Sequence, residues 1–273
     1  GDLDGALALL EEAERRDFAP PDLADLAAAI ATNVPDPASV LERLKGDARF
    51  LGSAHRAALL ATLTERTGRI RDAAFYWEVA ARQQPDEVTW HRQLARIYAV
   101  TGQMSRLTEA LRAVVRLAPK DEAARTDLVR RLTASGDVAG ARAAAWVPEG
   151  DLPEGERRRL AARVLLRGGR PEDAIAVYQQ ILGDAPDDCE SQVGLARAQI
   201  AAGRTQAGAK RLWRLLLDRG PAPPCRPAEV TRLLLAHVPG AARRLRRLLR
   251  VGRLRDAETV ESVLAAAGPK PRR

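Results

Sequence analysis

The sequence predicts an all-α fold built from repeated helix pairs, and three observations support this. Hydrophobic residues make up 46% of the chain while aromatic residues make up only 4%, and this Ala- and Leu-rich mixture favours helices over strands. Glycines recur at intervals of 33 or 34 residues, at Gly68, Gly102, Gly136, Gly169 and Gly203. Prolines recur at a second regular place, at Pro85, Pro119 and Pro186.

Each glycine lies in a segment with the composition of a turn between two helices. Residues 167–174 read RGGRPEDA and residues 251–257 read VGRLRDA. A glycine ends one helix, a polar turn follows, and an alanine begins the apolar stripe of the next helix. The prolines end the second helix of each pair. One hairpin per period predicts repeats at 54–87, 88–121, 122–154, 155–188 and 189–222.

These repeats resemble the tetratricopeptide repeat, whose pattern is W-x2-L-G-x2-Y, then A-x3-F, then P. The positions that carry the resemblance include Leu94, Ala95 and Tyr98 in one repeat, and Ala174, Tyr178 and Pro186 in another. The resemblance covers nearly the whole chain. It implies a right-handed superhelical solenoid of antiparallel helix hairpins over 1–273, with first helices lining a concave groove where partners usually bind.

The register departs from the 34-residue period at both ends. Gly203 and Gly252 are 49 residues apart, and Pro35 stands where a turn glycine is expected. The chain opens at the turn of a repeat, so we expect a fragment of a longer bacterial array. The expected segments are the second helix of a truncated repeat at 1–20, a degenerate repeat at 21–53, an insertion at 223–238, a last repeat at 239–268 and a disordered tail at 269–273.

Arginine recurs at one position of successive first helices, which the family pattern places on the inner face. The members of this row are Arg96, Arg130, Arg163, Arg197 and Arg246. Further arginines lie four residues from a member and share its helix face, namely Arg92, Arg159, Arg167 and Arg250. One interpretation is a groove that grips an acidic partner through the planar guanidinium forks. The other is internal pairing with Glu122, Glu156 and Glu190, which contributes only about 0–1 kcal/mol per pair.

The net charge of +8 is concentrated near the end of the chain. Residues 204–273 hold 17 Lys and Arg against 5 Asp and Glu, whereas residues 1–203 hold 27 against 31. The densest run is Arg243–Arg250, continuing to Arg253 and Arg255, with leucines at helical spacing. Such a basic amphipathic helix either meets an anionic partner or is the solvated face of a repeat helix. Nucleic acid is disfavoured because no aromatic stacking residues accompany the charge.

No pattern of catalysis or metal binding is present. His55, His91 and His237 are isolated, and no P-loop, GxGxxG or GxSxG motif occurs. We therefore expect no enzyme activity, no cofactor and no metal. No run of about 20 apolar residues predicts a membrane span.

The rarer residue types give two further expectations. Cys189 and Cys225 form no CxxC pair, and two free thiols are expected in preference to a single bridge. The four tryptophans fall at or near core positions of the repeats, so they are expected to pack inside. They are Trp77, Trp90, Trp146 and Trp213.

The sequence favours a non-catalytic scaffold that docks an acidic protein or peptide through its concave face. The alternative, which rests on the family resemblance, is the periplasmic region of a bacterial exopolysaccharide export protein. Such a region recruits a modifying enzyme or guides an anionic polysaccharide. This alternative slightly favours the periplasm over the cytoplasm.

Overall fold

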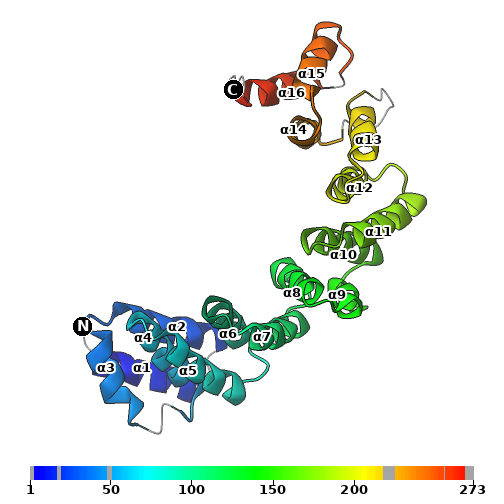
Figure 1. Cartoon of the computed structure of the whole chain (residues 1–273). Coiled ribbons are helices and arrows are strands. Elements are labelled where there is room, and N and C mark those ends of the chain that lie inside the picture. Colours follow the sequence, from blue (N-terminus) through cyan, green and yellow to red (C-terminus); the bar gives the residue numbers. More distant parts are fainter. Residues whose placement is uncertain (1–2, 17–19, 48–50, 218–224, 255, 268–273) are drawn as a thin grey trace. The chain divides into compact units, whose positions relative to one another are not determined.

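The computed structural model describes residues 3–16, 20–47, 51–217, 225–254 and 256–267, and all its regular elements are helices (Figure 1). The all-α prediction is confirmed for this part of the chain. The predicted tail at 269–273 and most of the Pro-rich segment before Cys225 lie outside it. The chain divides into two units, residues 1–128 and 129–273.

The first unit consists of short helices joined by tight turns. These helices are α1 (Leu3–Arg15), α2 (Pro20–Asn33), α3 (Pro37–Lys45), α4 (Ala54–Arg66), α5 (Ile70–Gln83), α6 (Val88–Thr101), α7 (Met104–Leu117) and the beginning of α8 (Glu122–Ala134). The pairs α4–α5 and α6–α7 pack as hairpins, and α5 also packs against α6. Leu10, Leu41, Leu59 and Leu60 are buried together where α1 to α4 meet.

The second unit continues the hairpin pattern. Its helices are the remainder of α8, α9 (Val138–Ala145), α10 (Glu154–Arg167), α11 (Pro171–Asp184), α12 (Cys189–Ala201), α13 (Thr205–Leu217), α14 (Pro227–His237), α15 (Ala241–Arg250) and α16 (Ala257–Ala266). The pairs α10–α11 and α12–α13 pack as hairpins. The first helices also contact one another in sequence, α10 with α12 and α12 with α14.

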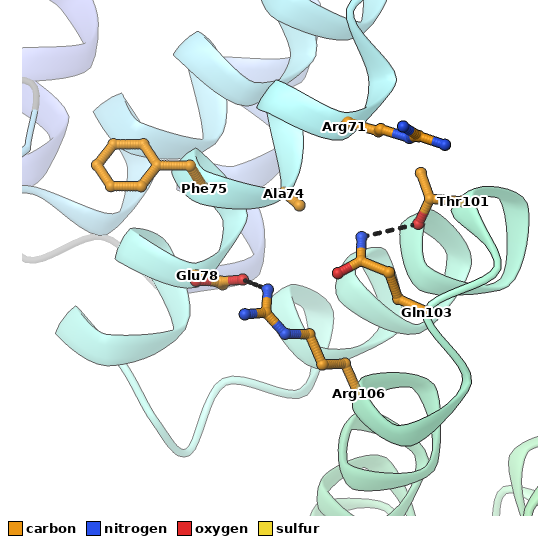
Figure 2. Close-up of a pocket in the computed structure, with 7 residues that line it drawn as sticks. All are labelled: Arg71, Ala74, Phe75, Glu78, Thr101, Gln103 and Arg106. Atoms are coloured by element: carbon orange, nitrogen blue, oxygen red, sulfur yellow. Dashed lines mark hydrogen bonds and ion pairs between the residues drawn. The ribbon is translucent and has the colours of Figure 1, made fainter.

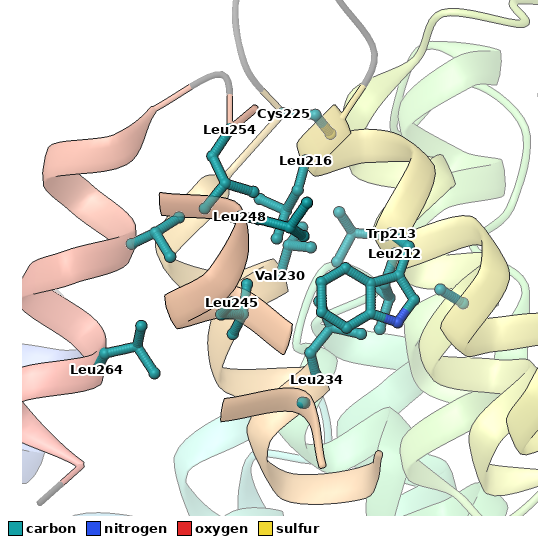
Figure 3. Close-up of a cluster of buried hydrophobic side chains, with 14 residues drawn as sticks. Leu212, Trp213, Leu216, Cys225, Val230, Leu234, Leu245, Leu248, Leu254 and Leu264 are labelled. Atoms are coloured by element: carbon teal, nitrogen blue, oxygen red, sulfur yellow. The ribbon is translucent and has the colours of Figure 1, made fainter. Parts of the chain in front are cut away.

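The segment predicted as an insertion, 223–238, is described from Cys225 onward and holds α14. Val230 and Leu234 of α14 are fully buried in a cluster that α13, α15 and α16 complete (Figure 3). Because α14 packs on α12 and α13, it occupies the place that the first helix of a following pair would take.

The predicted turn glycines close the helices in the expected way. Gly68, Gly102, Gly136, Gly169 and Gly203 all have φ between +74° and +84°. This left-handed conformation strains any residue that carries a Cβ, so glycine is favoured there. The spacing of 33 or 34 residues that predicted the hairpins therefore reflects a backbone requirement at these five turns.

The expectation of two free thiols is wrong, because Cys189 and Cys225 form a disulfide with Cα atoms 5.4 Å apart. Cys189 begins α12 and Cys225 lies just before α14. The packing of α14 on α12 brings these two helix starts together. The spacing of 36 residues alone gave no sign of this, because the sequence did not place α14 beside α12.

Three of the four tryptophans are buried, as expected. Trp77 and Trp90 stack with ring centroids 6.0 Å apart, and Trp213 lies in the second unit's core. Trp146 is the exception, with 36% of its surface exposed. The preceding helix α9 has only eight residues and ends at Ala145, so Trp146 stands in extended backbone beyond it.

Candidate partner-binding pocket

A pocket of about 120 Å³ lies on the first helices of the second unit. Arg163 and Arg167 of α10, Arg197 of α12 and Arg226 beside α14 supply its positive charge, while Glu190 and Glu229 supply its negative charge. Each helix turns its apolar residues, such as Leu165 and Leu195, into the core. The opposite face is therefore left to these charged side chains.

The charged side chains of the pocket alternate in sign. Glu190 lies between Arg163, whose Nη1 is 3.0 Å from Oε1, and Arg226, whose Nη2 is 3.8 Å from Oε2. Glu229 lies between Arg197 at 3.1 Å and the same Arg226 at 3.3 Å. Four arginines and two glutamates leave an excess of two positive charges.

Arg226 takes an unusual backbone conformation in this network. Its φ of 44° is the single positive value among the non-glycine residues that the structure describes. Such a conformation is unfavourable for a residue with a Cβ, and it persists only where surrounding contacts impose it. The neighbouring Cys225 is tied to α12 by the disulfide. The disulfide therefore links the two positions that directly precede Glu190 and Arg226.

The floor of the pocket is formed where α11 meets α12. A Cβ at Gly194 would lie 2.4 Å from Cζ of Tyr178, so the absence of a side chain lets the tyrosine ring lie against α12. Tyr178 is the residue that the repeat pattern predicted at a packing position, and it is buried. Gly194 was not identified from the sequence, because its role depends on the approach of α11.

The structure places most of the predicted arginines in ion pairs with carboxylates of the chain. Besides Arg163 and Arg197, Arg92 lies 2.9 Å from Asp121, Arg96 lies 2.5 Å from Glu65, and Arg159 lies 3.6 Å from Asp188. Arg130 is also engaged in an interaction. The three glutamates were expected to pair within their own helices, but Glu190 of α12 pairs with Arg163 of α10. Internal pairing thus accounts for much of the row.

Arg246 and Arg250 differ from the rest of the predicted row. Both are exposed on α15 and have no carboxylate partner among the residues that the structure describes. The helix that follows Arg197 in the series of first helices is α14, so these two arginines do not line the pocket with Arg163 and Arg197.

A larger and more open pocket of about 560 Å³ lies in the first unit between α5 and the start of α7. Figure 2 shows the side chain of Arg106 turned toward Glu78, with Arg71 and Thr101 on the side of the pocket away from Glu78. Glu78 accepts hydrogen bonds from Arg106 at 2.9 Å and from Tyr98 at 2.8 Å. Burial and this bond to Glu78 raise the pKa of Tyr98 to about 12. This pocket is formed largely by second helices and holds none of the predicted arginines.

The sequence of residues 160–223 matches the family model described as tetratricopeptide repeat. Within the chain, this segment is similar to tetratricopeptide repeats. This matched segment includes Arg163, Arg167, Glu190 and Arg197 of the pocket. No curated protein sequence matches the chain.

Several solved structures resemble this chain. They include a tetratricopeptide repeat protein from Parabacteroides merdae (14% identity, TM-score 0.40, 97% of this chain and 92% of that one). MamA from Desulfovibrio magneticus has 15% identity and a TM-score of 0.37, covering 59% and 92%. YrrB, whose structure is described as having an unusual peptide-binding site, has 13% identity and a TM-score of 0.35, covering 65% and 89%. These identities and TM-scores are too low for any binding property of those proteins to be transferred to this chain.

The described ranges contain no group of three or more His, Cys, Asp or Glu side chains arranged to hold a metal ion. None of their helices combines the length and apolar character that a membrane crossing requires.

Proposed function

We propose that this chain is a non-catalytic protein-interaction scaffold that docks an acidic peptide segment in the pocket of α10, α12 and α14. The observation that carries the proposal is the excess of two positive charges in a concave site on the first helices. Planar guanidinium groups bind carboxylates through paired hydrogen bonds, which favours an acidic partner.

The ion pairs of the pocket are compatible with this role. Arg197 and Arg226 are about half exposed, and pairs with that exposure contribute only about 0–1 kcal/mol. An arginine has five N–H donors, so Arg163 or Arg197 can keep its glutamate and still donate to a ligand carboxylate. The glutamates meanwhile hold the guanidinium groups in place, which lowers the ordering cost of binding.

The proposal is tested by selecting acidic peptides that bind the full chain from a peptide library, and measuring the affinity of the best one for two variants. The pocket variant carries Arg163→Glu and Arg197→Glu, and we expect its affinity to fall by about a hundredfold. The control carries Arg142→Glu and Arg204→Glu, which make the same charge change at exposed arginines outside the pocket. Equal losses in the two variants would refute docking in the pocket.

A role for the remaining predicted arginines as partner contacts stays a prediction. Arg92 and Arg96 belong to the first unit, where each already holds a carboxylate. Their charge reversal in the same assay, compared with the pocket variant, measures whether the partner extends that far.

A second candidate function is the periplasmic region of a bacterial exopolysaccharide export protein. The disulfide favours it, because disulfides persist in oxidising compartments such as the periplasm. The net charge of +8 suits an anionic polymer. Retardation of the chain in a gel that contains an anionic polysaccharide, but not in one that contains a neutral polysaccharide, would support this function.

A further inference from the structure

The helix α15 carries the most strongly basic surface that the structure describes. Its sequence from Ala241 to Arg250 contains five arginines and no acidic residue. All five are exposed. None of the five has a carboxylate partner within the described ranges, whereas Arg163 and Arg197 of the pocket do.

The arginines occupy one face of α15 because the leucines occupy the other. Leu245 and Leu248 are buried against α13, α14 and α16 (Figure 3). At 100° per residue, Arg243, Arg246, Arg247 and Arg250 fall on the opposite side of the helix. We call these four residues the basic face. The buried leucines fix the orientation of the helix, so the four guanidinium groups are presented together to solvent.

Arg244 is placed differently from the basic face. Its guanidinium carbon lies 4.2 Å from the centroid of the Trp213 ring, a distance at which cation–π attraction holds it. The arginine therefore covers the indole that would otherwise be the nearest platform for stacking a base. Because the Trp213 ring is covered, it cannot stack on a base beside the basic face. This disfavours single-stranded nucleic acid as the ligand.

The extent of the basic face limits the size of its ligand. From Arg243 to Arg250 the helix rises by about 10 Å, or two turns. The adjacent helix α16 carries the exposed acidic residues Glu258 and Glu261. These carboxylates would repel a long polyanion laid across both helices. Binding to a membrane surface would favour leucines beside the arginines, but Leu245 and Leu248 face the core.

We propose that the basic face of α15 is a docking surface for a short acidic protein segment, separate from the pocket of α10, α12 and α14. Two turns of helix present four guanidinium groups without a carboxylate partner among the described residues, and these match a run of Asp or Glu side chains of similar length. The surface adds a second contact for an acidic partner within the same unit. Two linked contacts raise the overall affinity above that of either one.

The test uses the full chain and a fluorescent polyglutamate peptide. The test variant carries Arg243→Gln, Arg246→Gln, Arg247→Gln and Arg250→Gln, because glutamine keeps helix propensity while removing charge. The control carries Arg15→Gln, Arg16→Gln, Arg69→Gln and Arg142→Gln, four exposed arginines that already pair with carboxylates. Both variants lose the same net charge. We expect affinity to fall about tenfold or more in the test variant and less than about twofold in the control.

Circular dichroism checks that both variants keep the helicity of the wild type. If the fourfold variant loses it, the pairs Arg243→Gln with Arg247→Gln and Arg246→Gln with Arg250→Gln are measured instead, and each is expected to weaken binding. An equal loss of affinity in the test and control variants would mean that only the net charge of the chain matters. That result would overturn the proposal. Retention of polyglutamate by every α15 variant would overturn it as well.

Two further arms separate the outcomes. A variant with Arg163→Gln and Arg197→Gln shows whether polyglutamate binds the pocket instead; if only this variant loses binding, the α15 proposal fails while the proposed function stands. Vesicles containing phosphatidylserine and duplex DNA are titrated in parallel. If either binds more tightly than polyglutamate and loses binding in the α15 variant, the acidic protein segment is the wrong ligand.

Discussion

Glu14 of α1 lies in a network of side chains that joins α1 to the start of α4. It accepts hydrogen bonds from Ser53 and from Nε of Arg56 at 3.0 Å, and Nδ1 of the buried His55 lies 3.6 Å away. Burial by itself would raise its pKa, but the bonds from His55 and Ser53 and the charge of Arg56 outweigh burial and lower the pKa below its usual value. The ionised form of Glu14 therefore stabilises the contact of α1 with α4.

This network predicts a loss of stability in acid. Because the pKa of Glu14 is lower in the folded state, its contribution is complete above the unfolded value of about 4.3 and is lost as the pH falls through the folded pKa. Glu14→Gln should destabilise the first unit at neutral pH by about 1–3 kcal/mol and much less near pH 3. Hydrogen exchange of the α1 and α4 amides measures both differences.

The control for this experiment is Glu12→Gln on the same helix. Among the described residues, Glu12 pairs with the exposed Arg15 and Arg16, so its loss should cost about 0.5 kcal/mol or less. If Glu14→Gln keeps its full effect near pH 3, the ionised carboxylate is not what stabilises the contact.

The arginine row shows how far residue-level prediction from sequence extends. The spacing identified Arg163 and Arg197 as neighbours on successive first helices, and both line one pocket. It did not reveal that Arg96 pairs with Glu65 of the preceding repeat or that Arg197 pairs with Glu229. These pairs link neighbouring repeats, and they depend on where the side chains point and on how closely the helices approach. The spacing of residues along the sequence does not contain this information.

At the scale of helices, α12 and α13 approach each other closely at Gly208. A Cβ there would lie 2.7 Å from the carbonyl oxygen of Ala196, a backbone atom that cannot turn aside. Gly208→Ala should therefore push the helices apart and destabilise the second unit by about 1–3 kcal/mol. Urea unfolding followed by circular dichroism measures the change.

Gly183→Ala is the matched control. Gly183 lies inside α11, and a Cβ there would have no neighbour within 4 Å. Alanine should stabilise the helix by up to about 1 kcal/mol, because it lowers the conformational freedom of the unfolded chain. Destabilisation of equal size in both variants would show that the close approach at Gly208 is not the cause.

The disulfide should stabilise the packing of α12 to α16. Its sequence separation of 36 residues corresponds to about 2–4 kcal/mol from loop closure in the unfolded chain. Reduction by a dithiol acts on this bond alone, because the chain has only two cysteines. We expect faster hydrogen exchange in α12 to α16 after reduction and unchanged exchange in α1 to α7. Unchanged exchange everywhere would contradict a stabilising role.

Element-level prediction succeeded where the backbone imposes a residue type. The turn glycines predicted the hairpins correctly because their φ values exclude most other residues. The contact of α14 with α12 could not be predicted, because it is set by apolar packing of Val230 and Leu234 and by the disulfide. Neither interaction leaves a periodic signal in the sequence.

At the scale of the whole molecule, positive charge is concentrated in the final quarter of the chain, where residues 204–273 hold 17 basic and 5 acidic side chains. Such a distribution raises the encounter rate with an acidic partner. The association rate of the selected acidic peptide should therefore fall about tenfold or more as salt rises from low to about 0.5 M. Stopped-flow fluorescence measures it, and a salt-independent rate would contradict electrostatic attraction.

Photo-crosslinking of the selected acidic peptide to the full chain tests the docking site most directly. A peptide with a photoreactive group beside its carboxylates is irradiated in the complex, and the attached residues are identified by mass spectrometry. Docking in the pocket predicts attachment to α10 and α12 and to Arg226 and Glu229, which line the pocket. Attachment confined to α13, or to the first unit, would contradict docking in the pocket.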